Sequence, residues 1–331
     1  MIQLVHKARR QIMFFLQLLI TVLLLYFAFR GVNVSVVLDS IWRIPLIALM
    51  LCFLILTVQI PLIAFRWHLL LTFFDCRIAP KILIRGILAE RLVNQLLPST
   101  VGGDSARVLT IVGVGASRGV AFLSVLFDRV SGILSIILLG GLISPLGLIY
   151  GIDSSTALTP SIIAAFAAII FIAIACMPRW ILRHIVRLFR SYRLNWIADN
   201  SHDMLRHGSF YKAACLVSTL VHIMSCAVFV LIAVALLGNA SLLPVAVCAP
   251  IIMFATAMPI AAGGWGVRES VSVILLQQIG IAAADALTIA ILFGIVQMLT
   301  GLLAGLALLG LQIGQPLQPE EPSPLEQQEI K

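Results

Sequence analysis

Two stretches of this chain place an arginine behind a proline and a glycine pair at the same spacing. They read PSTVGGDSAR over residues 98–107 and PIAAGGWGVR over residues 259–268. In both, the glycines follow the proline by four and five residues, and the arginine follows it by nine. Proline and glycine interrupt helices, and an arginine inside a bilayer costs about 2.5–3.5 kcal/mol even on lenient scales. The repeated arrangement predicts two broken helices facing a shared internal site, a construction found in many secondary transporters.

The chemistry expected of Arg107 and Arg268 is anion binding. A guanidinium presents five donors in a planar fork that suits phosphate and carboxylate groups. Short helices that begin after Gly102–Gly103 and Gly263–Gly264 would add free backbone N–H groups and the positive end of a helix dipole. Inside a bilayer, the natural ligand for such a site is the phosphate of a phospholipid headgroup.

A purely structural role for the same arginines is also open. Arg107 would then pair with Asp104, and Arg268 with Glu269 or Asp104, only to neutralise buried charge. Trp265 in the second motif either lines the outer site or acts as an aromatic anchor at the membrane interface, and we favour the anchor.

Further polar side chains lie close to the first motif or deep in an apolar run. Glu90, Arg91 and Asn94 are three or four residues apart, so they can share one helix face. Asp128 and Arg129 lie inside an apolar run, where charged residues face the protein interior or a watery cavity, either as a binding pair or as a neutralised structural pair. The candidate substrate-binding residues are Glu90, Arg91, Asn94, Gly102, Gly103, Asp104, Arg107, Asp128, Arg129, Gly263, Gly264, Trp265, Arg268 and Glu269.

The overall composition places the chain in a membrane. Hydrophobic residues make up 61% of its 331 residues and charged residues 11%, against roughly 25% charged in a soluble domain. The mean hydropathy is +1.11. The longest hydrophilic segment, about residues 178–212, is too short for a soluble catalytic domain. Any chemistry must therefore be done by residues within or beside the membrane.

The sequence also lacks the usual motifs of catalysis. It has no HExxH metal motif, no phosphate-binding P-loop and no suggestively spaced Ser/His pair, and its six cysteines show no CxxC spacing. We expect no catalytic residues, no cofactor, no metal and no nucleic-acid partner. An intramembrane enzyme is accordingly the weakest function class, and uphill transport would need an ion gradient, a partner or mass action.

Runs of apolar residues predict an all-α polytopic membrane protein. The first run lacks a signal-peptide cleavage site, so we expect an uncleaved span. Two broken or re-entrant helix pairs, at about 84–115 and 242–281, bring the total to about eight membrane segments. Residues 1–11 are an expected cytoplasmic N-terminus, 12–314 the transmembrane domain and 315–331 a disordered tail. The six expected full spans are residues 12–29, 44–65, 119–143, 160–177, 213–238 and 286–313.

Basic residues orient these spans, because cytoplasmic loops carry the excess of Lys and Arg. The N-terminus, a loop running from Arg66 to Arg85, and the segment 178–212 fall on the cytoplasmic side. Arg179–Arg193 fits either an amphipathic helix on the inner leaflet or a simple retention loop. Three spans separate the two broken pairs, so the pairs would enter from opposite sides as an inverted repeat.

The motifs taken as a set resemble a known family. The polar residues from Glu90 to Arg107, the pair Asp128–Arg129 and the stretch 263–269 resemble the flippase-like transmembrane domain of bacterial lysylphosphatidylglycerol synthases, also called multiple peptide resistance factors. The resemblance covers about residues 10–314. It implies a multi-pass protein of the bacterial inner membrane that moves aminoacylated or otherwise modified lipids between leaflets. The chain has no counterpart of the synthases' soluble aminoacyl-transfer domain, so synthase activity is not implied.

Two functions follow as expectations. The first is a lipid translocase for a modified or anionic-headgroup lipid, in which the two motif sites are exposed alternately. The alternative is a lipid-binding membrane subunit that does not transport and that scaffolds a separate glycosyltransferase or lipid synthase. Membrane lipids are the expected ligands in both cases, and a homo-oligomer is compatible with either.

Overall fold

The structure is a computed structural model, and it describes residues 2–96, 100–176, 209–258 and 261–312. Every regular element in these ranges is a helix. The α-helices are α1 (Ile2–Phe29), α2 (Val34–Arg43), α3 (Leu46–Phe73), α4 (Pro80–Leu96), α5 (Thr100–Val112), α6 (Arg118–Ile143), α7 (Ser154–Cys176), α10 (Ser209–Leu237), α11 (Leu242–Ala257), α12 (Val267–Gln278) and α13 (Ala283–Gln312). Short 3₁₀ turns connect some of them: η1 (Ser144–Tyr150), η2 (Asn239–Ser241) and η3 (Ala262–Gly264).

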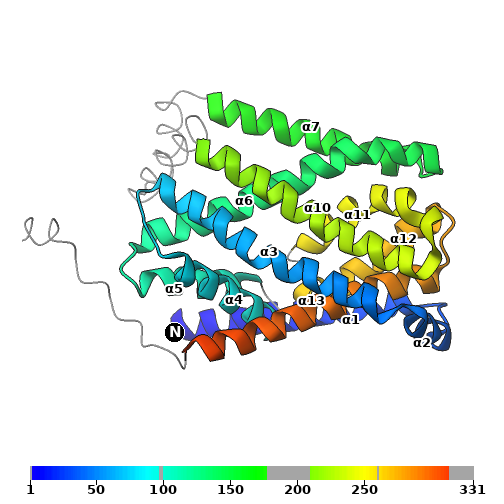
Figure 1. Ribbon diagram of the computed structural model, residues 1–331, viewed down its shortest axis with the longest axis horizontal. Helices are drawn as coiled ribbons and strands as arrows, with labels where there is room; N and C mark the ends of the chain where they lie inside the picture. The colour runs from blue at the N-terminus through cyan, green and yellow to red at the C-terminus, as the bar shows by residue number, and fades with distance from the viewer. Residues whose placement is uncertain (1, 97–99, 177–208, 259–260, 313–331) are drawn as a thin grey trace, which may run out of the picture.

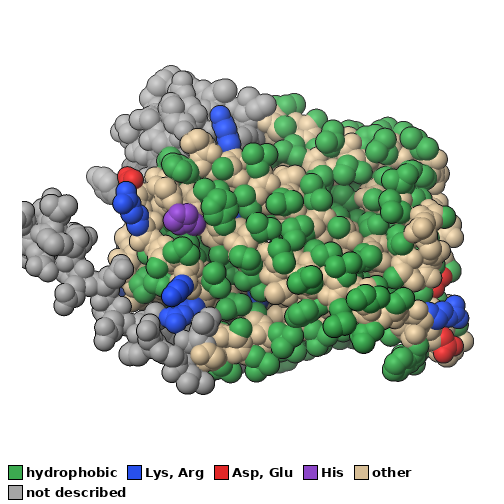
Figure 2. All heavy atoms as spheres, viewed as in Figure 1, with side chains coloured by type: hydrophobic (Ala, Val, Ile, Leu, Met, Phe, Trp, Pro, Cys, Tyr) green, Lys and Arg blue, Asp and Glu red, His purple; other side chains and the backbone are tan. Residues whose placement is uncertain are grey.

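The described helices have the length and surface of a membrane domain. Five are long and apolar enough to cross a bilayer, or six if the bent pair Phe15–Phe29 and Val34–Arg43 (85°) is one span. Hydrophobic side chains cover the middle of the face seen in Figure 2, and most of the visible charges lie near its two ends. Leu142 on α6 is 80% exposed and Ile47 on α3 is 72% exposed, as expected for residues that face lipid. The prediction of an all-α polytopic membrane protein is therefore confirmed.

Each of the six expected full spans overlaps a helix: α1, α3, α6, α7, α10 and α13. Among the described residues, however, α7 is not one of the five helices long and apolar enough to cross a bilayer, whereas α11, expected as half of a broken pair, is one of them. Three bounds differ from the expected ones by six residues or more: α1 begins at Ile2, α7 begins at Ser154 and α3 ends at Phe73. The second span was expected to end at residue 65, with Arg66 in a cytoplasmic loop, but α3 continues to Phe73. The apolar sequence resumes directly after the arginine, and Trp67 and Leu70 are fully buried. The helix can continue because a partner on another helix neutralises Arg66, as described below.

The two motif regions form helix pairs at opposite ends of the molecule. Figure 1 shows α4 and α5 towards the end where the N-terminus lies, and α11 and α12 towards the other end. The turn η3 and three glycines with positive φ (Gly263, Gly264 and Gly266) join α11 to α12. Residues 97–99 and 259–260, which include both motif prolines, lie outside the described residues. So do most of the basic segment 178–212, with the expected surface helix, and the expected tail 315–331.

Helix α13 packs closely against α4 through small residues. A Cβ added to Gly301 would lie 2.6 Å from Cγ of Gln95, and one added to Gly305 would lie 2.6 Å from Cδ1 of Leu92. The absence of these side chains lets the two backbones approach, which is the usual role of a GxxxG pattern in membrane helices. This contact holds the α4–α5 pair, and with it the first motif, against the long helix that follows the second motif.

Candidate functional site

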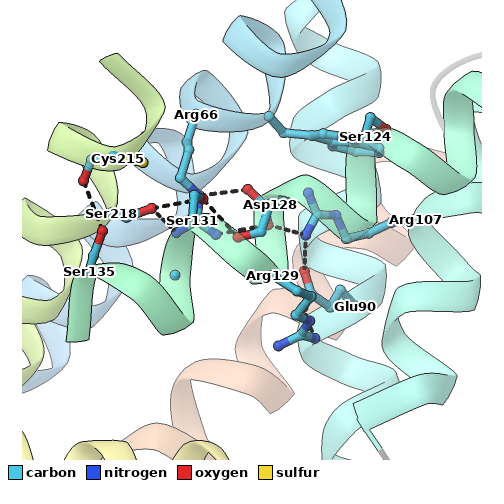
Figure 3. A network of polar contacts seen from close by, with 12 residues as sticks. Arg66, Glu90, Arg107, Ser124, Asp128, Arg129, Ser131, Ser135, Cys215 and Ser218 are labelled. Atoms are coloured by element: carbon cyan, nitrogen blue, oxygen red, sulfur yellow. Dashed lines mark hydrogen bonds and ion pairs between the residues drawn. The ribbon is translucent and has the colours of Figure 1, made fainter. Parts of the chain in front are cut away.

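The centre of the first site is the buried carboxylate of Asp128 on α6, which two arginines bind (Figure 3). Arg66 on α3 donates from Nε to Oδ1 at 2.6 Å and from Nη2 to Oδ2 at 2.8 Å. Arg107 on α5 donates from Nη1 to Oδ2 at 2.7 Å. Asp128 and Arg107 are each 1% exposed. Such an arrangement is tolerable in a low-dielectric interior only because the charges are paired and hydrogen-bonded.

A second set of ion pairs extends this centre towards the surface. Nη1 of Arg107 lies 3.4 Å from Oε2 of Glu90 on α4. Arg129 then bridges Glu90 and Asp104, at 3.0 Å and 2.7 Å from its Nη2. The exposed fraction of the side chain rises along this series of ion pairs, from 1% at Arg107 to 12% at Glu90 and 38% at Arg129. The network therefore runs from the protein interior to an accessible end.

The local sequence of α6 explains why the charges lie there. Ser124, Asp128, Ser131 and Ser135 follow one another at intervals of four, three and four residues, so they share one helix face. Ser131 contacts Ser218 of α10 at 3.1 Å, and Ser218 in turn accepts a hydrogen bond from Nη1 of Arg66 at 2.9 Å. This polar stripe faces α3 and α10. The hydrogen bond from Arg66 to Ser218 helps to hold the guanidinium in position against the carboxylate of Asp128.

Arg107 has unused hydrogen-bonding capacity. Its guanidinium lies 4.3 Å from the centre of the Trp67 ring, and the indole N–H of Trp67 donates to Ser124 at 2.9 Å. Its Nε and Nη2 atoms are buried and have no hydrogen-bond partner among the described residues. The same holds for Oδ1 of Asn94, which lies where a side chain on Gly103 would collide with it. Within the described part of the chain, two donor atoms of a fully buried arginine are thus unsatisfied, which costs free energy unless another group accepts hydrogen bonds from them.

Arg91 gives the site an excess of positive charge. It is partly exposed, and within the described part of the chain it makes no hydrogen bond or ion pair. Its electrostatic neighbours are Glu90, Arg129 and Arg66. Four arginines then face three carboxylates, which leaves a formal charge of +1. We call this group the buried charge cluster: Arg66, Glu90, Arg91, Asp104, Arg107, Asp128 and Arg129.

The second motif builds a smaller, fully paired site. Arg268 donates from Nε and Nη2 to Oε1 of its neighbour Glu269, at 3.0 Å and 2.5 Å. The other carboxylate oxygen accepts the backbone N–H of Gly266 at 2.5 Å and so caps α12. Arg268 is 1% exposed and Glu269 0%. The guanidinium lies 4.8 Å from the ring centre of Trp265 and 5.7 Å from that of Phe293.

The expected contacts of the motifs need three corrections. Asp104 pairs with Arg129 and not with either motif arginine. Among the described residues, Arg107 and Arg268 have no partner in common, so there the two motifs form separate networks and not one shared site. Trp265, for which we favoured an anchoring role, stacks on Arg268.

The glycine pairs also differ between the motifs. Helix α12 begins at Val267, after Gly263–Gly264, as predicted. Helix α5 instead begins at Thr100, so Gly102–Gly103 lies in its first turn. The first N–H groups of a helix lack intrahelical partners in any case, so glycine there need not stop it. At position 103, glycine leaves room for the side chain of Asn94, with which a Cβ would collide.

Comparison with protein families gives the site its context. A family model described as the lysylphosphatidylglycerol synthase TM region matches residues 14–305. The chain belongs to this family. The matched range contains both motifs and the whole buried charge cluster, so the resemblance seen in the sequence is confirmed. A search of curated proteins found no match.

In this member of the lysylphosphatidylglycerol synthase TM region family, sequence reasoning missed Arg66 and its neighbour Trp67. Both form part of the first site, through Asp128 and Arg107 respectively. A signal was present, because apolar residues continue from Leu69 to Leu71 after the arginine. A cation flanked on both sides by apolar sequence deserved the same interpretation as Asp128, namely a buried residue that needs a partner.

Proposed function

We propose that this chain is a lipid translocase of the bacterial inner membrane, which moves a lipid with an anionic or modified headgroup between the two leaflets. The observation that carries the proposal is the surplus cation of the buried charge cluster. A stabilising cluster would be expected to balance its charges, as the pair of Arg268 and Glu269 does. In the buried charge cluster, Arg91 makes no ion pair with any described residue and leaves a formal charge of +1, which one phosphodiester anion would neutralise.

The hydrogen-bond donors of the cluster could bind a headgroup phosphate in two steps, first through accessible donors and then through buried ones. The side chain of Arg129 is 38% exposed, so an anion can reach it in the present conformation. The unused Nε and Nη2 atoms of Arg107 are buried, so they become available only if the α4–α5 pair moves away from Trp67. Each charge-assisted hydrogen bond gained contributes about 1.5–3 kcal/mol. An anion that recruits Arg107 would therefore favour the moved state.

The placement of the two helix pairs supports alternating exposure. The α4–α5 and α11–α12 pairs lie towards opposite ends of the bundle (Figure 1). In the proposed arrangement they are re-entrant halves of an inverted repeat, with the N-terminus cytoplasmic and about eight membrane segments in all. Rocking of one half against the other would then expose the first motif to the inner leaflet and the second motif to the outer leaflet.

Neutralising Arg91 should slow lipid movement without harming the fold. We expect Arg91→Gln to reduce the initial translocation rate by roughly tenfold, the value of one charge-assisted hydrogen bond at a partly exposed position. Arg91→Lys should retain most of the rate because it keeps the charge. The measurement uses vesicles that contain the protein and phosphatidylglycerol with a dithionite-reducible fluorophore on an acyl chain.

The control for this experiment is Arg118→Gln, which removes an exposed arginine at the start of α6. It changes the net charge by the same amount but lies outside the cluster, so its rate should match that of the wild type. Equal rates for Arg91→Gln and Arg118→Gln would remove the basis for placing the headgroup at the cluster.

A further inference from the structure

A cavity lies between α6, α7 and α11, away from the buried charge cluster. Its volume is about 380 Å³, within the range of roughly 300–1,000 Å³ typical of ligand sites. On α6 it begins at Ile136, two turns beyond Asp128, or about 12 Å further along the helix. None of its lining residues is charged. They are Ile136, Ile137, Gly140, Ser155, Thr156, Thr159, Pro160, Ile163, Pro250, Ile251 and Phe254.

The lining of this cavity is amphiphilic. Isoleucines from all three helices form an apolar wall, whereas the polar groups come from the first two turns of α7. Within the described chain, the hydroxyls of Ser155 and Thr156 donate no hydrogen bond, and Thr159 donates to the carbonyl of Ser155. Pro160 has no N–H, so the carbonyl of Thr156 lacks its usual intrahelical donor. The site can thus bind a long apolar group that carries a polar, uncharged end.

The surroundings of the cavity are those of a lipid-facing surface. On α6 and α7, Leu142 is 80% exposed, Ile162 68% and Phe166 64%. Leu142 lies on a helix long and apolar enough to span a membrane, and Ile162 and Phe166 lie on a shorter apolar helix beside it, so we expect these side chains to contact hydrocarbon. We therefore expect the molecules next to the cavity to be membrane lipids.

We propose that this cavity binds one acyl chain of an ester-linked membrane glycerolipid, with the ester oxygens beside the hydroxyls of α7. A free fatty acid is a poorer occupant, because its carboxylate would lie among residues that offer no positive charge. Neutral ester oxygens need only the donors that Ser155 and Thr156 supply. The proposal does not depend on transport, since a scaffold subunit could hold a lipid in the same place.

The position of the cavity connects its occupant to the second motif. Pro250, Ile251 and Phe254 belong to α11, the first helix of the pair that carries Arg268. Two residues after Phe254, Thr256 packs so closely on Gly264 that a Cβ there would lie 2.6 Å from its methyl group. An acyl chain bound against α11 therefore contacts the same helix that supports the glycines of the second motif.

Photo-crosslinking tests this site. The full-length protein is reconstituted in vesicles with a phospholipid that carries a diazirine in one acyl chain, irradiated, and mapped by mass spectrometry. Labelling should concentrate on cavity residues such as Ile137, Ile163 and Ile251 and exceed that of the open surface at Leu142 and Phe166. Equal labelling of both groups would mean that lipid only surrounds the protein, and would overturn the proposal.

Matched variants separate the cavity from the general surface. Ile163 lines the cavity, although it is 44% exposed, so Ile163→Trp should narrow the cavity and lower labelling of α11 several-fold. Ile162 is 68% exposed and does not line the cavity, so Ile162→Trp should leave this labelling unchanged. Thr156→Val keeps the side-chain shape and should also lower the labelling. Unchanged labelling in both Ile163→Trp and Thr156→Val would contradict the site. Equally strong labelling by a diazirine fatty acid would contradict the preference for an ester-linked lipid.

Discussion

Replacing Asp128 with asparagine is expected to destabilise the protein by about 3–5 kcal/mol, because it leaves two buried guanidinium groups without their shared counter-charge. Arg66 and Arg107 both donate to this carboxylate and have side-chain exposures of only 10% and 1%. An asparagine amide has one acceptor oxygen where the carboxylate has two, and it carries no charge. The measurement is the apparent unfolding temperature of purified protein in detergent, followed by the fraction that remains monodisperse after heating.

Two further variants show whether charge is the cause. Asp39→Asn neutralises an exposed carboxylate on α2 and should leave the unfolding temperature unchanged. Combining Asp128→Asn with Arg66→Met removes one cation together with the anion, so it should recover part of the loss. A double variant less stable than Asp128→Asn alone would show that packing and not charge balance dominates at this position.

Glu269→Gln is expected to have a comparable effect at the second motif, again about 3–5 kcal/mol. Arg268 is completely buried, and its only ion pair is with this carboxylate among the described residues. The glutamine amide oxygen can still accept the N–H of Gly266, so the cap of α12 is largely kept and the loss reports the missing charge.

The same thermal assay tests this second prediction. Asp153→Asn, at an exposed position, serves as the control and should behave as the wild type. Adding Arg268→Met to Glu269→Gln should restore stability in part. If Glu269→Gln were as stable as the wild type, Arg268 would have to be compensated by another group, and the description of a closed, paired site would be wrong.

Local features of the sequence predicted more of this structure than non-local ones. Long apolar runs located α6, α10 and α13 to within a few residues, because span length is set by bilayer thickness. The pairing of Arg268 with Glu269 was among the alternatives, since the two residues are adjacent. The GxxxG pattern of Gly301 and Gly305 indicated close helix packing, which α4 supplies.

The partners in the buried charge cluster could not be predicted in this way. Arg66 binds a carboxylate 62 residues away, and Arg107 binds the same group 21 residues away on another helix. Such pairs are set by how helices pack, which a single sequence does not encode by spacing. The charge of Arg66 also led to a boundary placed one residue before it, because hydropathy treats a paired arginine like a solvated one. The ion pair with Asp128 offsets the free-energy cost of burying the Arg66 charge, so the helix can continue past it.

We propose that the surplus positive charge of the buried charge cluster, carried by Arg91 next to Glu90, serves the passage of a lipid headgroup and not only its binding. The most direct measurement is the extent of dithionite reduction of acyl-labelled phosphatidylglycerol in sealed vesicles containing the wild-type protein. We predict that label in the inner leaflet also becomes accessible, in proportion to the amount of protein. Reduction confined to the outer leaflet, as in protein-free vesicles, combined with binding of the same lipid that depends on Arg91, would contradict transport and favour the scaffold function.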